Sequence, residues 1–116
     1  MTGFFAAKVT DLPPGQTLKF RFVREGIRRE GFLANFNATI VAYENVCRHV
    51  PVTLDYGDNR FFEKSGNYFI CQTHGAIYEP LTGLCVRGPC GGASLKKIEF
   101  ELRGGEIWIL EEALAV

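Results

Sequence analysis

The sequence predicts an all-β protein, on three observations. Gly, Pro, Asn and Asp divide the chain into short segments, these segments are rich in β-branched and aromatic residues, and several alternate between apolar and charged side chains. Such alternation places one face of a strand against a core and the other against water. We therefore expect antiparallel strands joined by short turns, with helix only marginal.

Nine segments have the length and composition of strands. From the N-terminus they are residues 4–9, 17–24, 31–36, 38–44, 61–63, 68–71, 76–79, 95–102 and 106–110. Apolar and charged residues alternate most clearly in 19–24 and 97–102, and Gly104-Gly105 supplies the positive φ of a hairpin turn after the second of these. Four aromatic residues on these strands are expected in the core: Phe20, Phe22, Phe100 and Trp108. The charged triplet Arg28-Arg29-Glu30 reads as a solvated turn.

Length and charge limit the possible functions. A chain of 116 residues with 47% hydrophobic residues has the size and composition of one globular domain. Thirteen basic residues balance thirteen acidic ones, so nucleic acid is an unsuitable partner. Apolar runs are far shorter than the roughly 20 residues that span a bilayer, and the N-terminus has no secretion signal. These features predict a soluble cytoplasmic protein without a membrane anchor.

The chemistry of the chain is concentrated in two short motifs. Cys47-Arg48-His49 and Cys71-Gln72-Thr73-His74 each combine a thiolate with an imidazole, and twenty-one residues separate them. In a reducing compartment, cysteines spaced in this way indicate metal binding more than disulfides. The ligand types suit either the iron of a [2Fe-2S] cluster or a structural zinc ion, although the spacing differs from that of the common zinc finger.

The two motifs and their surroundings resemble those of Rieske [2Fe-2S] proteins. That family has C-x-H, a spacer and C-x-x-H followed by glycine and an aromatic residue, which here are Gly75 and Tyr78. The resemblance extends to residues 42–46 and to Thr82-Gly83. It implies one domain over residues 1–116, built as an antiparallel β-sandwich framework with a small inserted cluster-binding subdomain at about residues 45–92.

The resemblance also implies how the cluster is held. Cys47 and Cys71 would bind the inner iron, and His49 and His74 the outer iron near the surface. Because the imidazoles are neutral, the cluster is easier to reduce than one with four thiolates, with potentials of roughly −150 to +300 mV. Tyr78 corresponds to a family tyrosine that donates to a ligand thiolate, although simple packing would explain it nearly as well.

Two departures from the respiratory members of the family predict a reduction potential in the lower part of this range. Ala76 stands where those members have a serine that hydrogen-bonds a sulfide, and no cysteine next to the ligands forms their inter-loop disulfide. Gly88-Pro89 resembles the loop that covers the cluster. The spacer is somewhat long, and its residues 55–65 suggest a partner-specific contact.

Cys85 and Cys90 are left outside the predicted ligand set. Four residues separate them, which permits a disulfide, a second metal pair or two small buried side chains. A reducing compartment favours free thiols.

By resemblance, the protein is an electron carrier that works between a flavin-containing NAD(P)H reductase and a terminal oxygenase or another redox enzyme. An oxygenase itself needs a mononuclear iron on two histidines and a carboxylate, and this sequence has only two histidines, both assigned to the cluster. The alternative of another class is a Rieske-like small subunit or docking module of a larger enzyme, such as a nitrite reductase.

Overall fold

The computed structural model describes residues 3–48 and 50–113. Every strand pair is antiparallel. In chain order the elements are β1 (Phe4–Lys8), η1 (Val9–Asp11), β2 (Thr17–Arg24), β3 (Ile27–Phe36), β4 (Thr39–Glu44), β5 (Phe69–Ile70), β6 (Ile77–Tyr78), β7 (Cys85–Arg87), β8 (Phe100–Arg103), β9 (Glu106–Ile109) and β10 (Glu112–Ala113). The all-β prediction is confirmed. Within the described residues, no helix has the length and apolarity needed to cross a membrane.

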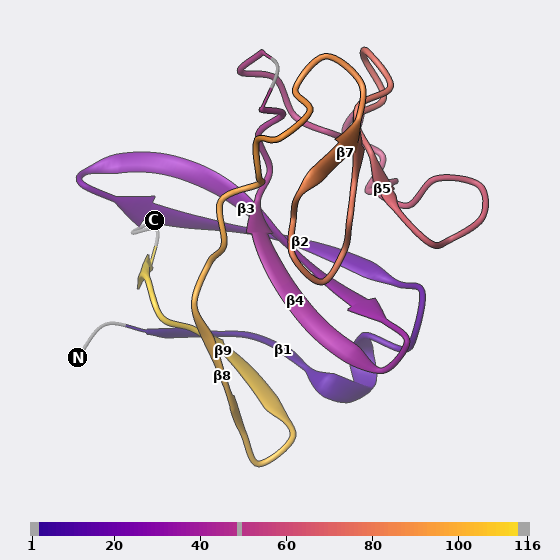
Figure 1. Ribbon diagram of the computed structural model, residues 1–116. Coiled ribbons are helices and arrows are strands. Elements are labelled where there is room, and N and C mark those ends of the chain that lie inside the picture. Colours follow the sequence, from indigo (N-terminus) through magenta and orange to yellow (C-terminus); the bar gives the residue numbers. More distant parts are fainter. Residues whose placement is uncertain (1–2, 49, 114–116) are drawn as a thin grey trace.

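Two sheets form the framework in the lower part of Figure 1. One has the strand order β10-β2-β3-β4 and the other β1-β9-β8. Their facing side chains make a core that includes Leu12, Phe22, Leu33, Ile107 and Ile109, all fully buried. The hairpin between β8 and β9 turns at Gly104-Gly105, where φ is +53° and +82°, as predicted.

The third sheet, of order β5-β6-β7, belongs to a smaller subdomain above the framework (Figure 1). A separate core lies beneath it, in which the rings of Phe32 and Phe61 stack with centroids 4.0 Å apart. Phe69 of β5 meets the same Phe32 ring edge-on at 5.2 Å. Phe32 comes from the framework strand β3, so packing of aromatic rings joins the subdomain to the framework.

Strand β3 from Gly31 to Asn35 and strand β4 from Val41 to Glu44 are buried on both faces. Leu33 and Ala42 point into the framework core, while Phe32, Ala34 and Tyr43 point into the core of the subdomain. In the same part of β3, Gly31 has no room for a side chain, because a Cβ atom there would lie 2.6 Å from both Ile98 and Phe20. The two cores thus lie on opposite faces of the β3–β4 strand pair.

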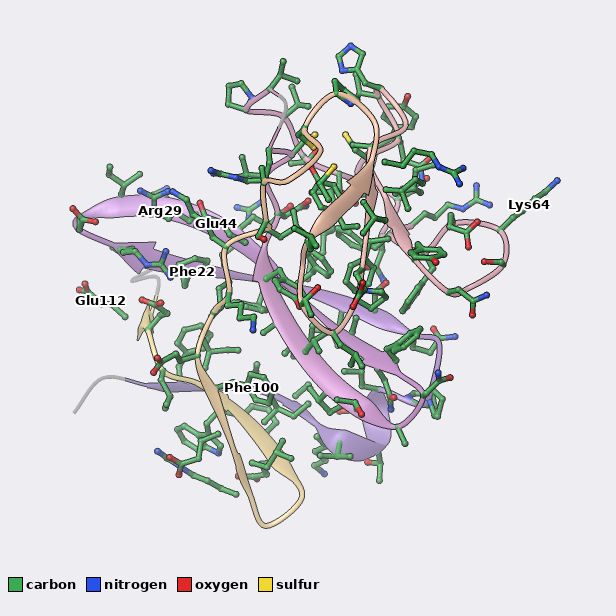
Figure 2. All side chains as sticks on the ribbon, in the orientation of Figure 1. Phe22, Arg29, Glu44, Lys64, Phe100 and Glu112 are labelled. Carbon is green, nitrogen blue, oxygen red and sulfur yellow. The ribbon has the colours of Figure 1, made fainter. Side chains whose placement is uncertain are left out.

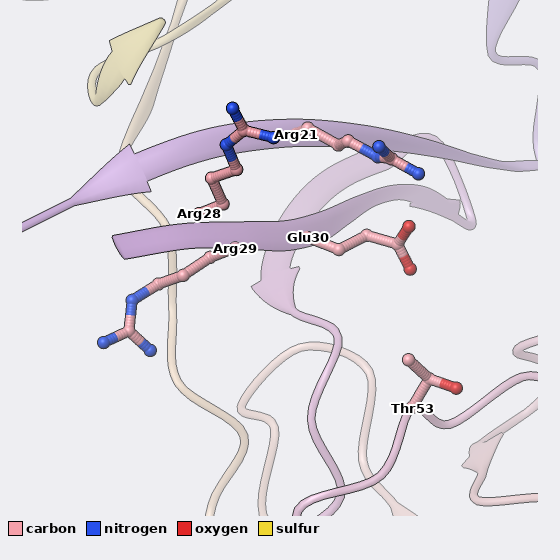
Figure 3. Close-up of a pocket in the computed structure, with 5 residues that line it drawn as sticks. All are labelled: Arg21, Arg28, Arg29, Glu30 and Thr53. Carbon is pink, nitrogen blue, oxygen red and sulfur yellow. The ribbon is translucent and has the colours of Figure 1, made fainter. Parts of the chain in front are cut away.

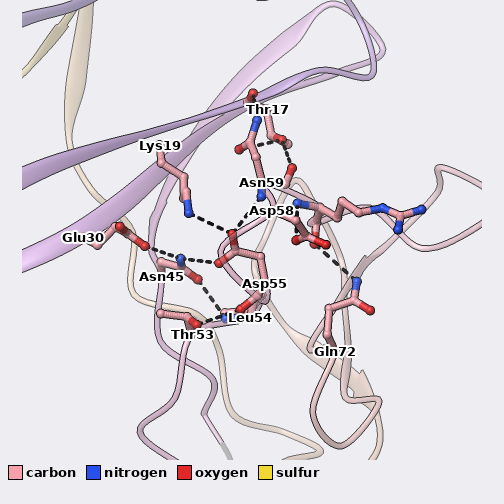
Figure 4. A network of polar contacts seen from close by, with 11 residues as sticks. Thr17, Lys19, Glu30, Asn45, Thr53, Leu54, Asp55, Asp58, Asn59 and Gln72 are labelled. Carbon is pink, nitrogen blue, oxygen red and sulfur yellow. Dashed lines mark hydrogen bonds and ion pairs between the residues drawn. The ribbon is translucent and has the colours of Figure 1, made fainter.

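A buried polar network fixes the chain where it leaves β4 (Figure 4). Asn45 donates to Glu30 Oε1 at 2.8 Å and to Asp55 Oδ1 at 3.0 Å, and its own Oδ1 accepts from the backbone N–H of Leu54 at 2.9 Å. Asp55 also pairs with Lys19 of β2 at 3.0 Å. These contacts tie the segment after β4 to β2 and β3.

Several boundaries differ from the sequence-based expectation. Strand β3 begins at Ile27, so the triplet Arg28-Arg29-Glu30 is strand and not a turn. Its charges are tolerated because Arg29 Nη1 contacts Glu44 Oε1 at 2.8 Å, a pair labelled in Figure 2, and Glu30 accepts from Asn45.

Other expected strands are shortened or absent. Residues 95–102 yield only the start of β8, preceded by a single bridge from Lys97 to Tyr43, and residues 61–63 yield one bridge at Phe62. The short strands β7 and β10 were not expected. Of the four expected core aromatics, only Phe22 is fully buried; the other three are half-buried.

Replacing Asp55 with asparagine is expected to lower the free energy of unfolding by roughly 1–3 kcal/mol at neutral pH. One carboxylate oxygen of Asp55 faces Lys19 and the N–H of Asn59, and the other faces the amide of Asn45. Whichever way an asparagine amide turned, its NH₂ group would therefore meet a donor. Urea denaturation measures the difference, and Asp58→Asn, at an exposed position, is the control.

The stabilisation by Asp55 should also depend on pH. Burial alone would raise the pKa of this carboxyl, but hydrogen bonds from Asn45 and Lys19 outweigh it and hold the pKa below its ordinary value of 3.8. Folding therefore favours the carboxylate, and this contribution is complete above the ordinary pKa and is lost as pH falls through the lower folded-state value. The difference between the wild type and Asp55→Asn should shrink below about pH 4; a constant difference would contradict this.

Candidate metal centre

Three loops meet at the end of the molecule remote from the β8–β9 hairpin, and sulfur atoms gather between them in Figure 2. The first loop, residues 45–60, follows β4, and the second, residues 71–76, joins β5 to β6. The third loop, residues 88–92, follows β7. The backbone N–H of Gln72 donates to the carbonyl of Leu54 at 2.8 Å, so the first two loops are joined by main-chain bonding.

Cys47 lies in the first loop, three residues beyond the end of β4. Its backbone N–H donates to the carbonyl of Val52 at 2.7 Å, a main-chain bond within the first loop. The side chain is only 2% exposed and points into the core of the subdomain. The fold thus delivers this thiol to the interior directly from the ordered end of a strand.

Cys71 is positioned by the hairpin between β5 and β6. Its N–H donates to the carbonyl of Ala76 at 2.9 Å, and its own carbonyl accepts from the N–H of Gly75 at 2.8 Å. Gly75 has a φ of +73°, a left-handed conformation that glycine adopts without strain. The Cys71 thiol is fully buried at the base of this turn.

The environment of Cys71 contains groups that stabilise a thiolate. Burial is the largest influence and raises the pKa of the Cys71 thiol, and contact with the Cys47 side chain raises it further. The backbone N–H groups of Thr73 and His74 act in the opposite direction, because they donate to the sulfur of Cys71. In a dry site these two donors favour a negatively charged sulfur.

Of the four predicted ligands, the structure brings the two cysteines together. The thiols of Cys47 and Cys71 lie side by side in the interior, in hydrogen-bonding contact. His74 is exposed at the tip of the second loop. His49 lies outside the described residues.

Tyr78 of β6 connects the first loop to the third. Its hydroxyl lies 3.4 Å from the sulfur of Cys47 and 3.1 Å from that of Cys90, and it accepts a hydrogen bond of 2.9 Å from the N–H of Arg48. Burial and the contacts with both cysteines raise the pKa of Tyr78 far above its ordinary value, so the hydroxyl keeps its proton. The sequence left packing and a contact with a ligand sulfur both open, and the structure shows that Tyr78 is buried and in contact with the sulfur of Cys47.

The third loop closes against the second. A Cβ atom on Gly88 would lie 2.9 Å from Cα of Ala76, so glycine is required for this approach, and its φ is +103°. Ala76, which stands where the respiratory members of the family have a serine, is fully buried under this loop. Gly88 thus packs against the second loop, while a role of Gly88-Pro89 in covering a cluster stays a prediction.

Cys85 and Cys90 are both buried free thiols, as the sequence favoured. Their sulfur atoms are 2.9 Å apart. The contact between Cys90 and Tyr78 was not anticipated, because no local sequence pattern links the third loop to β6.

A shallow depression of about 280 Å³ lies beside the first loop, lined by Arg21, Arg28, Arg29, Glu30 and Thr53 (Figure 3). In Figure 3 the Arg29 side chain points away from Arg21 and Arg28, toward the other side of β3. Arg21 and Arg28 are exposed, whereas Arg29 and Glu30 make the internal contacts given above. Its lining residues include no cysteine or histidine, so we assign the depression no part in metal binding.

The donor set suits a centre with a dry inner end and a wet outer end. Two buried thiols in contact, with N–H and O–H donors around them, provide the environment in which thiolates bind iron. Among residues 3–48 and 50–113, no three His, Cys, Asp or Glu side chains converge as for a single metal ion. A binuclear cluster needs only two protein ligands on each metal, and the two thiols in contact suit one iron of such a cluster.

Comparison with known proteins agrees with this arrangement. The model of the Rieske [2Fe-2S] domain family matches residues 3–100. A search of curated protein sequences finds no significant match.

Similar solved structures include the ferredoxin of carbazole 1,9a-dioxygenase from Nocardioides aromaticivorans IC177, which is 22% identical, with a TM-score of 0.71 over 97% of this chain and 100% of that chain. A chain in a complex of reduced oxygenase and oxidized ferredoxin in carbazole 1,9a-dioxygenase is 23% identical, with a TM-score of 0.72 over 98% and 97% of the two chains. The terminal oxygenase from Novosphingobium sp. KA1 is 16% identical, with a TM-score of 0.77, but only 31% of that chain is covered.

At these identities the solved structures establish the fold, and the family model, which covers most of the sequence, establishes the family. The buried pair of thiols and the exposed histidine lie within the matched residues. The chain therefore belongs to the Rieske [2Fe-2S] domain family.

Proposed function

We propose that this protein is a one-electron carrier that holds its single [2Fe-2S] cluster through Cys47, His49, Cys71 and His74. The observation that carries the proposal is the contact between the buried thiols of Cys47 and Cys71, which two separate loops of a Rieske domain bring together. When bound, the cluster supplies a site that takes up and releases one electron at a time. The two cysteines would hold the inner iron and the two histidines the outer iron.

The protein's own groups define the two ends of this site. Cys47 and Cys71 are buried at 2% and 0% exposure, so the inner end is shielded from water. His74 is exposed, so the outer end meets solvent and any docking partner. Hydrogen bonds to the ligand sulfurs from Tyr78 and from the backbone of residues 73 and 74 stabilise negative charge at the inner end.

The proposed partners follow from the solved structures with the same fold. The ferredoxin of carbazole dioxygenase is matched over its whole length, whereas the terminal oxygenase is matched over less than a third. We infer that this chain acts as a single-domain ferredoxin that passes electrons to a terminal oxygenase and receives them from a flavin-dependent NAD(P)H reductase. The free thiols of Cys85 and Cys90 suit a reducing compartment, and we place the protein in the cytoplasm.

The first experiment is absorption and low-temperature EPR spectroscopy of the purified protein, as isolated and after dithionite, together with iron and zinc analysis. Two irons per chain and an EPR signal that appears on reduction are expected for mixed histidine and cysteine ligation. One zinc and no iron, after anaerobic reconstitution as well, would overturn the proposal in favour of a structural zinc site.

Replacement of His74 by cysteine is expected to lower the reduction potential by roughly 100 mV or more, provided that iron is retained. A thiolate adds a negative charge to the cluster, so the added electron meets more repulsion. Protein-film voltammetry measures the shift. Thr73→Cys adds a thiol at an exposed neighbouring position and should leave the potential nearly unchanged; equal potentials for wild type and His74→Cys would refute the ligand assignment.

Replacement of Tyr78 by phenylalanine should lower the potential by roughly 20–60 mV, the equivalent of one weakened hydrogen bond of about 0.5–1.5 kcal/mol. The phenylalanine ring keeps the packing of Tyr78 but loses the hydroxyl 3.4 Å from the Cys47 sulfur. Tyr68→Phe, at a position 40% exposed, is the matched control. If Tyr78 only packs, both variants will have the wild-type potential.

A further inference from the structure

Two buried thiols outside the proposed ligand set lie in contact beside the site. The sulfur of Cys90 is 2.9 Å from that of Cys85, and the two side chains are 7% and 2% exposed. A disulfide bond has a length of about 2.05 Å, so less than about 1 Å of approach separates the pair from a covalent link.

The main chain around the pair keeps the two cysteines together. The N–H of Cys85 donates to the carbonyl of Ala93 at 2.7 Å, and its carbonyl accepts from the N–H of Gly92 at 3.1 Å. The N–H of Ala93 donates to the carbonyl of Cys90 at 3.0 Å. These bonds close the third loop and keep Cys85 and Cys90 next to each other.

We propose that Cys85 and Cys90 form a redox-active dithiol, which hydrogen peroxide oxidises to a disulfide inside the third loop. The alternative is that Cys85 and Cys90 are only two small buried side chains that pack against each other and do not react. Residues 88, 89, 91 and 92 of the loop are exposed, so a small oxidant needs to pass only this segment to reach Cys90.

The reaction balances with one peroxide molecule. The sulfur of Cys90 attacks one peroxide oxygen, the O–O bond breaks, and a sulfenic acid and one water are formed. The sulfur of Cys85 then attacks that of Cys90, the S–O bond breaks, the S–S bond forms and a second water leaves. Two thiols lose two electrons and two protons in total. Burial, and then contact with Cys90, raise the pKa of Cys85 to about 11, which keeps Cys85 in the thiol form at rest.

Oxidation of the pair should reach the ligand sulfur through Tyr78, an effect that rests on the function proposed above. The Tyr78 hydroxyl lies between Cys90 and Cys47, at 3.1 and 3.4 Å. With Cys47 bound as a thiolate, the hydroxyl must donate to it. The single proton of the Cys90 thiol, which is directed at the Cys85 sulfur in the structure, then turns to the hydroxyl 3.1 Å away. Hydrogen bonds in such a chain strengthen one another. A disulfide has no proton to donate, so the bond from Tyr78 to Cys47 weakens and the reduction potential falls.

The first test counts thiols and needs no cluster. The full-length protein is treated with peroxide, unfolded, alkylated and digested with trypsin and chymotrypsin, which cut after Arg87 and Tyr78 and so separate Cys71, Cys85 and Cys90. We expect a disulfide-linked pair of fragments, residues 79–87 with 88–96, that dithiothreitol releases. Cys85→Ser is the matched control and should not yield it. Alkylation of both Cys85 and Cys90 after peroxide would overturn the proposal, as would a link from either to Cys71.

The second test measures the reduction potential of the iron-loaded protein before and after peroxide, and after recovery with dithiothreitol. The wild type should shift reversibly to lower potential, and Cys85→Ser should not shift. Cys90→Ala should have a lower potential without any oxidant, whereas Cys90→Ser, which retains an O–H donor, should stay near the wild type. An unchanged potential in a protein shown to contain the disulfide would refute the link through Tyr78. A protein without iron would refute the proposed function, while the fragment test would still decide the fate of the dithiol.

Discussion

The ladder between β3 and β4 is the constraint on which both halves of the molecule depend. Most strands of an antiparallel sheet have one wet face, but β3 from Gly31 to Asn35 is buried on both faces. Leu33 contributes to the framework core and Phe32 to the core under the third sheet. A change of register by one residue would exchange these two side chains, so the pairing of β3 with β4 fixes both cores at once.

The two sides of this ladder also determine where the thiols lie. Tyr43 of β4 points into the subdomain core, and Cys47 follows on the same chain, one turn beyond the end of the strand. The network of Asn45 and Asp55 holds this exit, with both side chains nearly fully buried. Burying polar groups costs free energy unless every partner is supplied, so such a network favours one arrangement of the loop over its alternatives. The position of Cys47 is therefore well fixed, because Cys47 closely follows the constrained strand pair.

The sequence predicted those parts of the structure whose information is local. Alternation in residues 19–24 and the Gly104-Gly105 turn gave β2 and the β8–β9 hairpin correctly, and the spacing of the two motifs indicated the paired loops. The start of β3 was missed because three charged residues suggest solvent, and only the distant Glu44 and Asn45 make a strand acceptable there. The same reason explains the unexpected link from Cys90 to Tyr78, which depends on the third loop folding back onto β6. Asn45 and Asp55 offered a weak local signal, polar residues at a strand end and within a long loop, that becomes meaningful only with Lys19 and Glu30 beside them.

Burial strengthens the hydrogen bonds around the sulfur of Cys47. In water a phenol near a sulfur would compete with solvent for every hydrogen bond, whereas Tyr78 is fully buried and retains its proton. In the low dielectric of the interior, each donor near a thiolate has a larger electrostatic effect than at the surface. The exposed side of His74 has no such shielding, so charge there is moderated by water and by whatever docks. In the proposed cluster site, the inner end is thus where this chain can adjust an electron's energy, and the outer end is where a partner can dock.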